Sequence, residues 1–440
     1  MTAAVFPAAG DFRTRLLASP MTGFQKRALT VCALLNVLDG FDVFSITFAA
    51  PAIARELHIA KDALGFVFAA GLIGMALGSL LLSPLADLYG RRSVVLGALL
   101  LMIVGTVWTA VAPGLPGVGA SRVLTGLGIG ALVSVINPLA AEYANSRRRD
   151  LCVTLMNLGF PAGGVIGGLA ATALLPHVGW RAIFIVATVL AVAMLVVTLV
   201  WLPEPLTGLL ARPRATTLTR VNAFLARCHQ PAIAALPAHV AHAKRSFAAL
   251  LTPAARGTTL RITLIYFLYV MSVFYIHSWI PSLVVGAGYT PAQAAGASVI
   301  LNLSGVVGGL GFGLLVPRFG LKPIVIVALL LSAAGIVLFG AVPPRLGALQ
   351  AMAAVVGVAT IGGMTNLYAV VSRSFPAAAR ASGTGFVIGI GRFGSALGPA
   401  LGGILLAHGL VRAEVSWALA LPAAAAAAIL GLARLTDRDI

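Results

Sequence analysis

The chain has 440 residues, of which 60% are hydrophobic and only 10% charged, with a net charge of +18. Soluble proteins carry about 25% charged residues, so this composition excludes a soluble protein and predicts an integral membrane protein. The apolar stretches are continuous rather than alternating, which excludes a membrane β-barrel.

Apolar stretches of about 20 residues, long enough to cross a bilayer as helices, recur along the chain. They predict twelve transmembrane helices near residues 29–52, 63–84, 92–112, 118–142, 151–175, 180–202, 260–284, 292–316, 321–342, 347–371, 382–407 and 413–434. The first stretch is too long for the apolar region of a signal peptide, so we interpret it as an uncleaved span. The expected fold class is therefore all-α integral membrane.

A hydrophilic segment separates six spans from six. We expect an N-terminal tail at 1–28, a six-helix bundle at 29–203, a basic central loop at 204–258, a second six-helix bundle at 259–434 and a C-terminal tail at 435–440. Residues 216–228 of the loop are expected to form a short surface helix. The halves share a short basic turn (83–93 and 313–323) and a glycine-rich fifth span (159–168 and 391–403). This internal similarity predicts two pseudo-symmetric bundles.

Basic residues are concentrated on one side of the predicted topology. With the N-terminus in the cytoplasm, the loops on the outer side carry only Arg55, Lys61, Arg181, Arg345 and Arg412. This asymmetry follows the positive-inside rule and predicts that both termini are cytoplasmic. It also explains the net charge without a nucleic-acid partner, and we interpret the basic loop as a topology signal that contacts anionic lipids.

Two carboxylates, Asp39 and Asp42, lie inside the first span. They are three residues apart, so they share one helix face with Asn36. A carboxylate at bilayer depth costs about 2.5–3.5 kcal/mol on insertion scales and usually has a function. We predict that at least one of them carries a coupling proton, and Asn36 is a candidate for the substrate site. The alternative is a structural pair held by arginine or hydroxyl partners.

Arg392 lies near the middle of the eleventh span. A guanidinium stays charged and can hold a carboxylate through two hydrogen bonds, so we predict that Arg392 anchors an organic anion. The alternative is a fixed salt bridge to Asp39 or Asp42. His277, Tyr269 and Asn366 are further candidates for binding the substrate, although ordinary packing explains the aromatic residues of the seventh span equally well.

Charged residues near the ends of several spans form a third group. They can pair across helices, and we interpret them as a gating or structural charge network rather than as a substrate site: Asp87, Arg91, Arg92, Arg122, Glu142 and Arg149. The histidines of the basic loop lack carboxylate or thiolate partners, and Cys32, Cys152 and Cys228 have no metal-binding spacing. We therefore predict no metal site and no cofactor, and the absence of a nucleophile–base set argues against an enzyme.

Five stretches of the chain resemble the major facilitator superfamily and, within it, the aromatic acid:H+ symporter family. They are LDGFD (38–42), PLADLYGRR (84–92), RVLTGLGIG (122–130), EYANSRRR (142–149) and GIGRFGSALGPALGG (389–403). The resemblance implies proton coupling at Asp39 and Asp42 and a substrate carboxylate on Arg392. It also implies a gating turn at Asp87 and Arg91 and an acid that closes the fourth span at Glu142.

The chain departs from this family's pattern in the two basic turns. Ser83, Leu88 and Pro317 stand where Gly, Arg and Asp are usual. This implies a weaker charge network in the turns, and none of the three positions touches the expected substrate site.

The resemblance implies a proton-coupled symporter that imports small organic acids, above all aromatic carboxylates such as benzoate or hydroxybenzoates, by alternating access. The expected partners are a small organic anion, H+ and the lipid bilayer, with the monomer as functional unit in the bacterial inner membrane. An antiporter of the same fold that exports drugs or weak acids is the main alternative, because the GP-x-x-GG stretch of the eleventh span is similar to glycine motifs of antiporters. A receptor that senses a ligand without moving it is disfavoured by the two acids of the first span.

Overall fold

The computed structural model describes residues 11–82, 84–211, 216–236, 252, 255–375 and 380–433. These residues form helices and no strands, and twelve of the helical segments are long and apolar enough to cross a membrane. The prediction of an all-α, multi-pass membrane protein with twelve spans is thereby confirmed. The histidines and basic residues expected at 237–251 lie outside the described residues.

The first half of the chain contains α1 (Asp11–Ala18), α2 (Gly23–Glu56), α3 (Lys61–Leu77), α4 (Leu85–Tyr89), α5 (Arg91–Val111), α6 (Leu115–Tyr143), α7 (Arg149–Asn157), α8 (Gly159–Val178) and α9 (Arg181–Trp201). A π-helical turn, Gly78–Leu82, extends α3. Two short helices follow, α10 (Leu206–Ala211) and α11 (Thr217–Arg227). The second half contains α12 (Arg256–Gly286), α13 (Pro291–Phe319), α14 (Leu321–Ala341), α15 (Leu346–Arg373), α16 (Arg380–Ala407) and α17 (Arg412–Leu432).

The two basic turns have a similar backbone conformation at corresponding glycines. Gly90 precedes α5 with φ +88° and Gly320 precedes α14 with φ +83°. Residues other than glycine rarely adopt a positive φ, so both turns favour glycine at this position. The matched conformations support the interpretation of two related halves.

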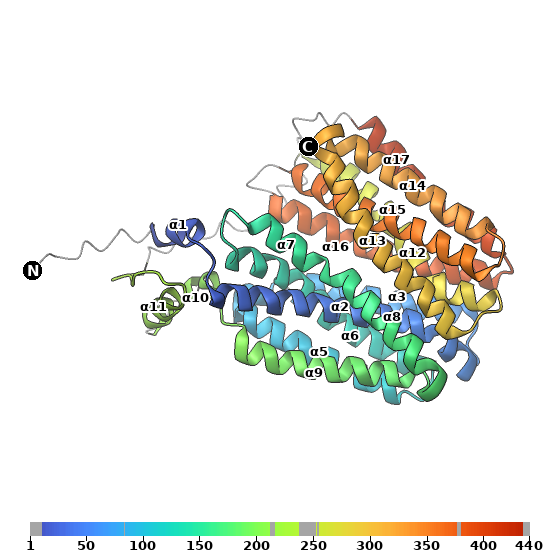
Figure 1. Ribbon diagram of the computed structural model, residues 1–440, viewed down its shortest axis with the longest axis horizontal. Helices are drawn as coiled ribbons and strands as arrows, with labels where there is room; N and C mark the ends of the chain where they lie inside the picture. Colours follow the sequence, from blue (N-terminus) through green and yellow to red (C-terminus); the bar gives the residue numbers. More distant parts are fainter. Residues whose placement is uncertain are drawn as a thin grey trace, which may run out of the picture.

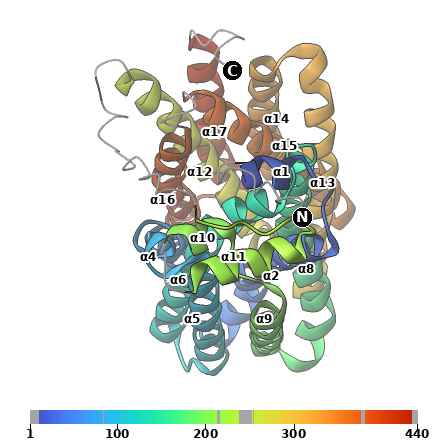
Figure 2. The ribbon, with the colours of Figure 1, turned by 90° about the vertical axis from the view of Figure 1, so that its left-hand side faces the viewer.

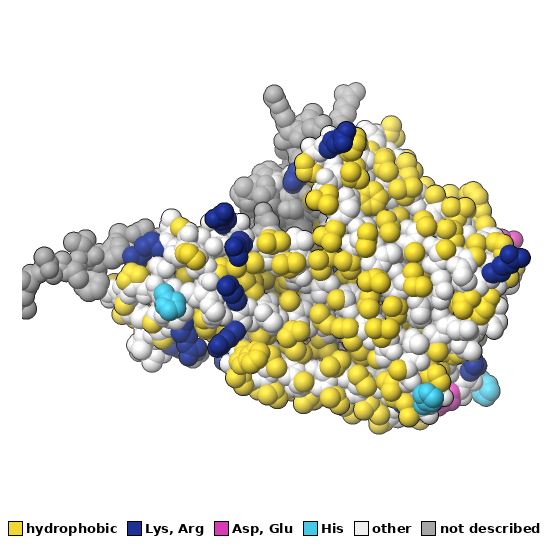
Figure 3. Space-filling model, in the orientation of Figure 1, with side chains coloured by type: hydrophobic (Ala, Val, Ile, Leu, Met, Phe, Trp, Pro, Cys, Tyr) yellow, Lys and Arg dark blue, Asp and Glu magenta, His cyan; other side chains and the backbone are white. Residues whose placement is uncertain are grey.

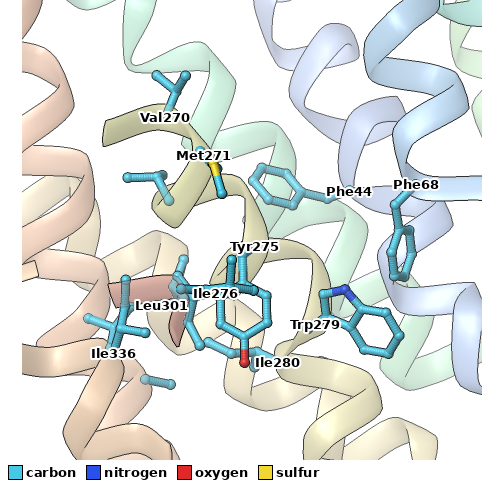
Figure 4. Close-up of a cluster of buried hydrophobic side chains, with 14 of the residues drawn as sticks. Phe44, Phe68, Val270, Met271, Tyr275, Ile276, Trp279, Ile280, Leu301 and Ile336 are labelled. Carbon is cyan, nitrogen blue, oxygen red and sulfur yellow. The ribbon is translucent and has the colours of Figure 1, made fainter. Parts of the chain in front are cut away.

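The long helices form two bundles that lie side by side, α2 to α9 in one and α12 to α17 in the other (Figure 1). Across the boundary, α3 packs against α16, α8 against α13, and α2 against α12. A Cβ added at Gly65 of α3 would lie 2.8 Å from the Pro399 carbonyl oxygen of α16. Nearby, the rings of Phe68 and Trp279 meet edge to face at 5.5 Å (Figure 4). The bundles are thus tightly joined where α3 begins and α16 ends.

The opposite end of the molecule is basic and carries the short helices. In Figure 2, α10 and α11 lie across the ends of the long helices of the first bundle. Lys and Arg side chains gather at this end, whereas apolar side chains cover the flanks of both bundles (Figure 3). The apolar face of α11 buries Val221, Phe224 and Leu225, and Phe224 meets the ring of Phe24 at 5.3 Å. The short surface helix expected at 216–228 is therefore present.

Gly40 sets the approach of α2 to α8. A Cβ at this position would lie 1.9 Å from the Phe160 carbonyl oxygen, which is backbone and cannot move aside. We expect Gly40→Ala to reduce the free energy of unfolding by about 1–3 kcal/mol, as overpacking typically does. Thermal unfolding of the purified protein in detergent measures this loss. Gly97→Ala in α5 is the matched control, because no atom lies within 4 Å of its added Cβ, and it should leave the midpoint unchanged or raise it.

Candidate functional site

Asp42 and Arg122 form a buried ion pair that joins α2 to α6. Arg122 Nη2 lies 2.9 Å from Asp42 Oδ2, and Nη1 donates to Oδ1 at 3.3 Å. The Asp42 side chain is 0% exposed and the Arg122 side chain is 2% exposed. The Arg122 guanidinium also lies 5.9 Å from the centre of the Phe184 ring. Arg122 was expected among the charges at helix ends, and the structure instead places it against the acidic face of the first span.

Asp39 lies on the same face of α2 and has no such partner. Its side chain is 2% exposed, and Oδ1 makes no hydrogen bond within the described part of the chain. The two charged groups that act on it electrostatically are Arg392 and Asp42. Asp42 is already engaged by Arg122, so Arg392 of α16, in the other bundle, is the basic group whose charge acts on Asp39.

Arg392 is half-buried, and its Nε atom is buried without a hydrogen-bond partner among the residues described. No ion pair links it to Asp39 or Asp42, and within the described residues Asp42 pairs with Arg122. A cation and a carboxylate from different bundles thus interact electrostatically without an ion pair between them. Each has hydrogen-bonding capacity left for a ligand or a proton.

Two tyrosines stand beside Arg392. A Cβ at Gly391 would lie 2.1 Å from the Tyr266 ring, so the glycine lets α12 approach α16 closely at this level. The Tyr266 hydroxyl donates to the Tyr368 hydroxyl at 3.1 Å, and the charge of Arg392 acts on Tyr266. The site therefore offers aromatic surface and hydroxyl groups next to the guanidinium of Arg392. Tyr266 is one of the aromatic residues of the seventh span that the sequence offers as a surface for a ring ligand, and Tyr368 is a polar interruption of the tenth span.

The other residues predicted to bind substrate have partners within the protein. Asn36 Nδ2 donates to the Met156 carbonyl oxygen at 2.7 Å and so ties α2 to α7. Asn366 Nδ2 donates to the Gly362 carbonyl oxygen within α15. The Tyr269 hydroxyl contacts Ser332 Oγ and the Thr360 carbonyl oxygen, and His277 Nε2 lies 2.9 Å from Thr360 Oγ1. Their roles toward a substrate stay predictions.

The basic end holds the rest of the predicted charge network. Arg91 pairs with Glu142, whose other oxygen accepts a hydrogen bond from Thr207 of α10. Arg92 Nη2 donates to the Leu199 carbonyl oxygen at 2.7 Å. Arg149 is exposed at the start of α7, and the side chain of Asp87 lies outside the described residues.

Glu204 is a member of this network that sequence analysis missed. It follows α9 between Pro203 and Pro205 and accepts hydrogen bonds from the backbone N–H groups of Arg91 and Arg92, at 2.9 and 3.2 Å. These groups open α5, so the carboxylate caps that helix. Burial raises the pKa of Glu204, although the two N–H groups favour its charged form.

We expect Glu204→Ala to lower the free energy of unfolding by about 1–2 kcal/mol, the usual range for a lost helix cap. Glu204→Gln keeps one acceptor oxygen and should recover part of this loss. Thermal unfolding in detergent provides the comparison. Glu414→Ala removes an exposed cap at the start of α17 and should reduce stability less. An equal loss of stability in Glu204→Ala and Glu414→Ala would argue against a stabilising helix cap at Glu204.

A family model described as Major Facilitator Superfamily matches residues 32–320 and 262–439. The chain belongs to the Major Facilitator Superfamily. Over 425 residues it is 32% identical to the 4-hydroxybenzoate transporter PcaK of Pseudomonas putida, with 94% of each chain covered. It is also 32% identical over 427 residues to a gallate transporter of Pseudomonas putida, again with 94% of each chain covered.

A solved structure has the same fold. The crystal structure of a D-xylose-proton symporter matches with a TM-score of 0.72 and 17% sequence identity, covering 93% of this chain and 97% of that chain. The superfamily consists of transporters rather than enzymes, so the prediction that the chain is not an enzyme is confirmed. In the described residues, no group of three or more His, Cys, Asp or Glu side chains could hold a metal ion.

Proposed function

We propose that this protein is a proton-coupled symporter that imports aromatic carboxylates across the bacterial inner membrane. The observation that carries the proposal is the pair of Asp39 and Arg392, a buried carboxylate and a half-buried guanidinium that come from different bundles, interact electrostatically and are not bonded to each other. Relatives described as 4-hydroxybenzoate and gallate transporters support the choice of substrate.

The two acids of the first span have different roles in this proposal. Asp42 is held by three hydrogen-bond contacts from Arg122, so protonating it would leave a buried guanidinium without its counter-charge. Breaking such a buried pair costs several kcal/mol. Asp39 Oδ1 has no hydrogen bond to lose among the described residues. We therefore assign the coupling proton to Asp39 and a structural role to Asp42.

Charge balance couples the proton to the substrate. When the site is empty, the charges of Asp39 and Arg392 can compensate each other as the bundles move together. A proton on Asp39 without substrate leaves the charge of Arg392 uncompensated. A substrate anion without a proton leaves the charge of Asp39 uncompensated. Both states are unfavourable, because burying a charge without a counter-charge is costly. With both ligands bound, Asp39 is neutral and the carboxylate neutralises Arg392. Only the empty and the doubly loaded sites can then close, which is the requirement for symport.

The positive-inside rule places the basic end, with α1, α10 and α11, in the cytoplasm. With this orientation the tight joint between α3 and α16 would lie on the outer side, which supports a state that is closed toward the outside. Substrate and proton would leave toward the cytoplasm. One chain supplies both bundles, so we propose that the monomer is functional, with the proton as its only coupling ion and no cofactor.

Uptake of labelled 4-hydroxybenzoate and benzoate into proteoliposomes tests the proposal. With an inward proton gradient, the wild type should accumulate label above equilibrium, and a protonophore should abolish the accumulation. Asp39→Asn should lose accumulation yet retain exchange of internal for external substrate. Absence of uptake, together with proton-driven movement of drugs or acids in the outward direction, would replace the importer by the antiporter alternative.

A further inference from the structure

His277 presents an unused hydrogen-bond acceptor between the bundles. The single hydroxyl hydrogen of Thr360 is directed to the Val356 carbonyl oxygen, 2.7 Å away within α15. Thr360 Oγ1 therefore accepts from His277, whose Nε2 atom must carry the hydrogen at 2.9 Å. In the neutral ring Nδ1 is then an acceptor, and the structure gives this atom no hydrogen bond to any described residue.

Asn302 of α13 supplies a second acceptor close by. Its Nδ2 atom donates to the Ser298 carbonyl oxygen at 2.9 Å, which leaves Oδ1 as the remaining polar atom. The side chain is 0% exposed, and Oδ1 has no partner in the part of the chain that the structure describes. A buried acceptor without a partner costs about 1–3 kcal/mol, so its retention inside an apolar interface calls for a reason.

Phe44 brings the two acceptors to one place. Its ring centre lies 6.2 Å from that of His277 and 5.4 Å from that of Phe160. A Cβ added at Gly164 would lie 2.8 Å from both Phe44 Cδ2 and Asn302 Oδ1, so these two atoms adjoin the same glycine. Figure 4 shows the Phe44 ring directed toward α12, the helix that carries His277. The result is an aromatic wall flanked by two hydrogen-bond acceptors.

This wall lies at a suitable depth relative to the charged site. Phe44 is five residues beyond Asp39 on α2, or roughly 7.5 Å along the helix at 1.5 Å per residue. At about 100° per residue Phe44 is also turned about 140° around α2 from Asp39. An acid bound by Arg392 therefore reaches Phe44 with its ring only if it extends along α12, the helix that contacts both α16 next to Arg392 and Phe44. A hydroxyl group on the far side of that ring would then approach His277 and Asn302.

We propose that His277 and Asn302 form a subsite that recognises a ring hydroxyl group of the transported acid. The inference rests on the proposed function and deepens it, since it selects hydroxylated aromatic acids over unsubstituted ones. A phenolic hydroxyl donates one hydrogen and so satisfies an acceptor. A ring that lacks it leaves both acceptors unpaired when the bundles close. Gly164 and Asn302 belong to different bundles, so the rocking of the bundles opens and closes this subsite.

Binding of three acids to the purified transporter tests the subsite by calorimetry. 4-Fluorobenzoate has nearly the size of 4-hydroxybenzoate but donates no hydrogen bond, and benzoate lacks the substituent. For the wild type we expect 4-hydroxybenzoate to bind at least about tenfold more tightly than either, as sites built for a hydroxyl group reject analogues without it. Equal affinities for the three acids would overturn the proposal without the need for any variant.

Two variants test whether His277 and Asn302 cause the difference in affinity between the acids. Asn302→Leu and His277→Phe should each reduce the ratio of affinities for 4-hydroxybenzoate and benzoate to about threefold or less, while benzoate still binds. Ser304→Ala is the matched control, because its hydroxyl bonds to the Leu301 carbonyl oxygen of its own helix, and it should retain the wild-type ratio. The ratio compares two ligands on one sample, so partial misfolding does not distort it.

The outcomes separate the two proposals. If the wild type binds neither benzoate nor 4-hydroxybenzoate, the proposed function fails. If it binds both and the two variants keep the wild-type ratio, the subsite fails while the proposed function stands.

Discussion

Arg392→Ala is expected to weaken the binding of aromatic acids about a hundredfold and to abolish their gradient-driven uptake. Removal of one partner from a buried, hydrogen-bonded charge pair costs about 2–5 kcal/mol. In the proposed loaded state, the substrate carboxylate would be left without a counter-charge beside the acidic face of α2. The affinity for 4-hydroxybenzoate, measured by calorimetry on the purified variant, gives the size of the effect.

Two further variants separate charge from geometry at this position. Arg392→Lys keeps the positive charge but loses the planar pair of donors that matches a carboxylate, so we expect intermediate affinity. Arg318→Ala removes an arginine that is exposed on α13 and should leave binding unchanged. Wild-type affinity in Arg392→Ala would show that the arginine belongs to the scaffold rather than to the substrate site.

Loss of the Asp42–Arg122 pair is expected to have the largest effect on stability. Asp42→Ala leaves the guanidinium of Arg122 buried without its partner, which should reduce the free energy of unfolding by about 3–5 kcal/mol. Asp39 has no direct bond to lose, so Asp39→Asn should leave stability unchanged or increase it. Thermal unfolding in detergent measures both.

A double variant tests whether the effect arises from the unpaired charge. Asp42→Leu combined with Arg122→Met removes both charges and should recover most of the lost stability, because well-packed apolar side chains often replace a buried ion pair without cost. An equal loss of stability in Asp39→Asn and Asp42→Ala would contradict the division of roles between the two acids.

Sequence alone predicted the fold because the length of an apolar stretch is a direct measure of a membrane span. The sequence-based prediction underestimated the length of the helices, since hydropathy detects only the part of a helix inside the bilayer. α2 begins at Gly23, where Thr22 and Gln25 form a capping box, rather than near residue 29. The matching halves were also visible, because glycine-rich stretches and basic turns recur at corresponding positions.

The candidate site was predicted less completely, because its members come from distant parts of the chain. Arg122 is 80 residues from Asp42, and only the rotation of α6 about its axis directs it to the first span. The sequence does not give this rotation, so Arg122 was interpreted as a charge near a helix end. Asn302 was recognisable as a polar residue in a span, but its unpaired oxygen depends on how closely α13 approaches Gly164. Glu204 had a usable signal, an acid between two prolines directly after a span.

In the proposed symport mechanism, Asp39 carries the proton that accompanies the substrate. Proteoliposomes that contain a trapped pH-sensitive dye test it most directly, with addition of 4-hydroxybenzoate under a substrate gradient and no initial pH difference. We predict that the wild type acidifies the lumen as substrate enters. Asp39→Asn should exchange labelled substrate without any change of internal pH. Substrate-dependent acidification that persists in Asp39→Asn would contradict the account and move the coupling site elsewhere.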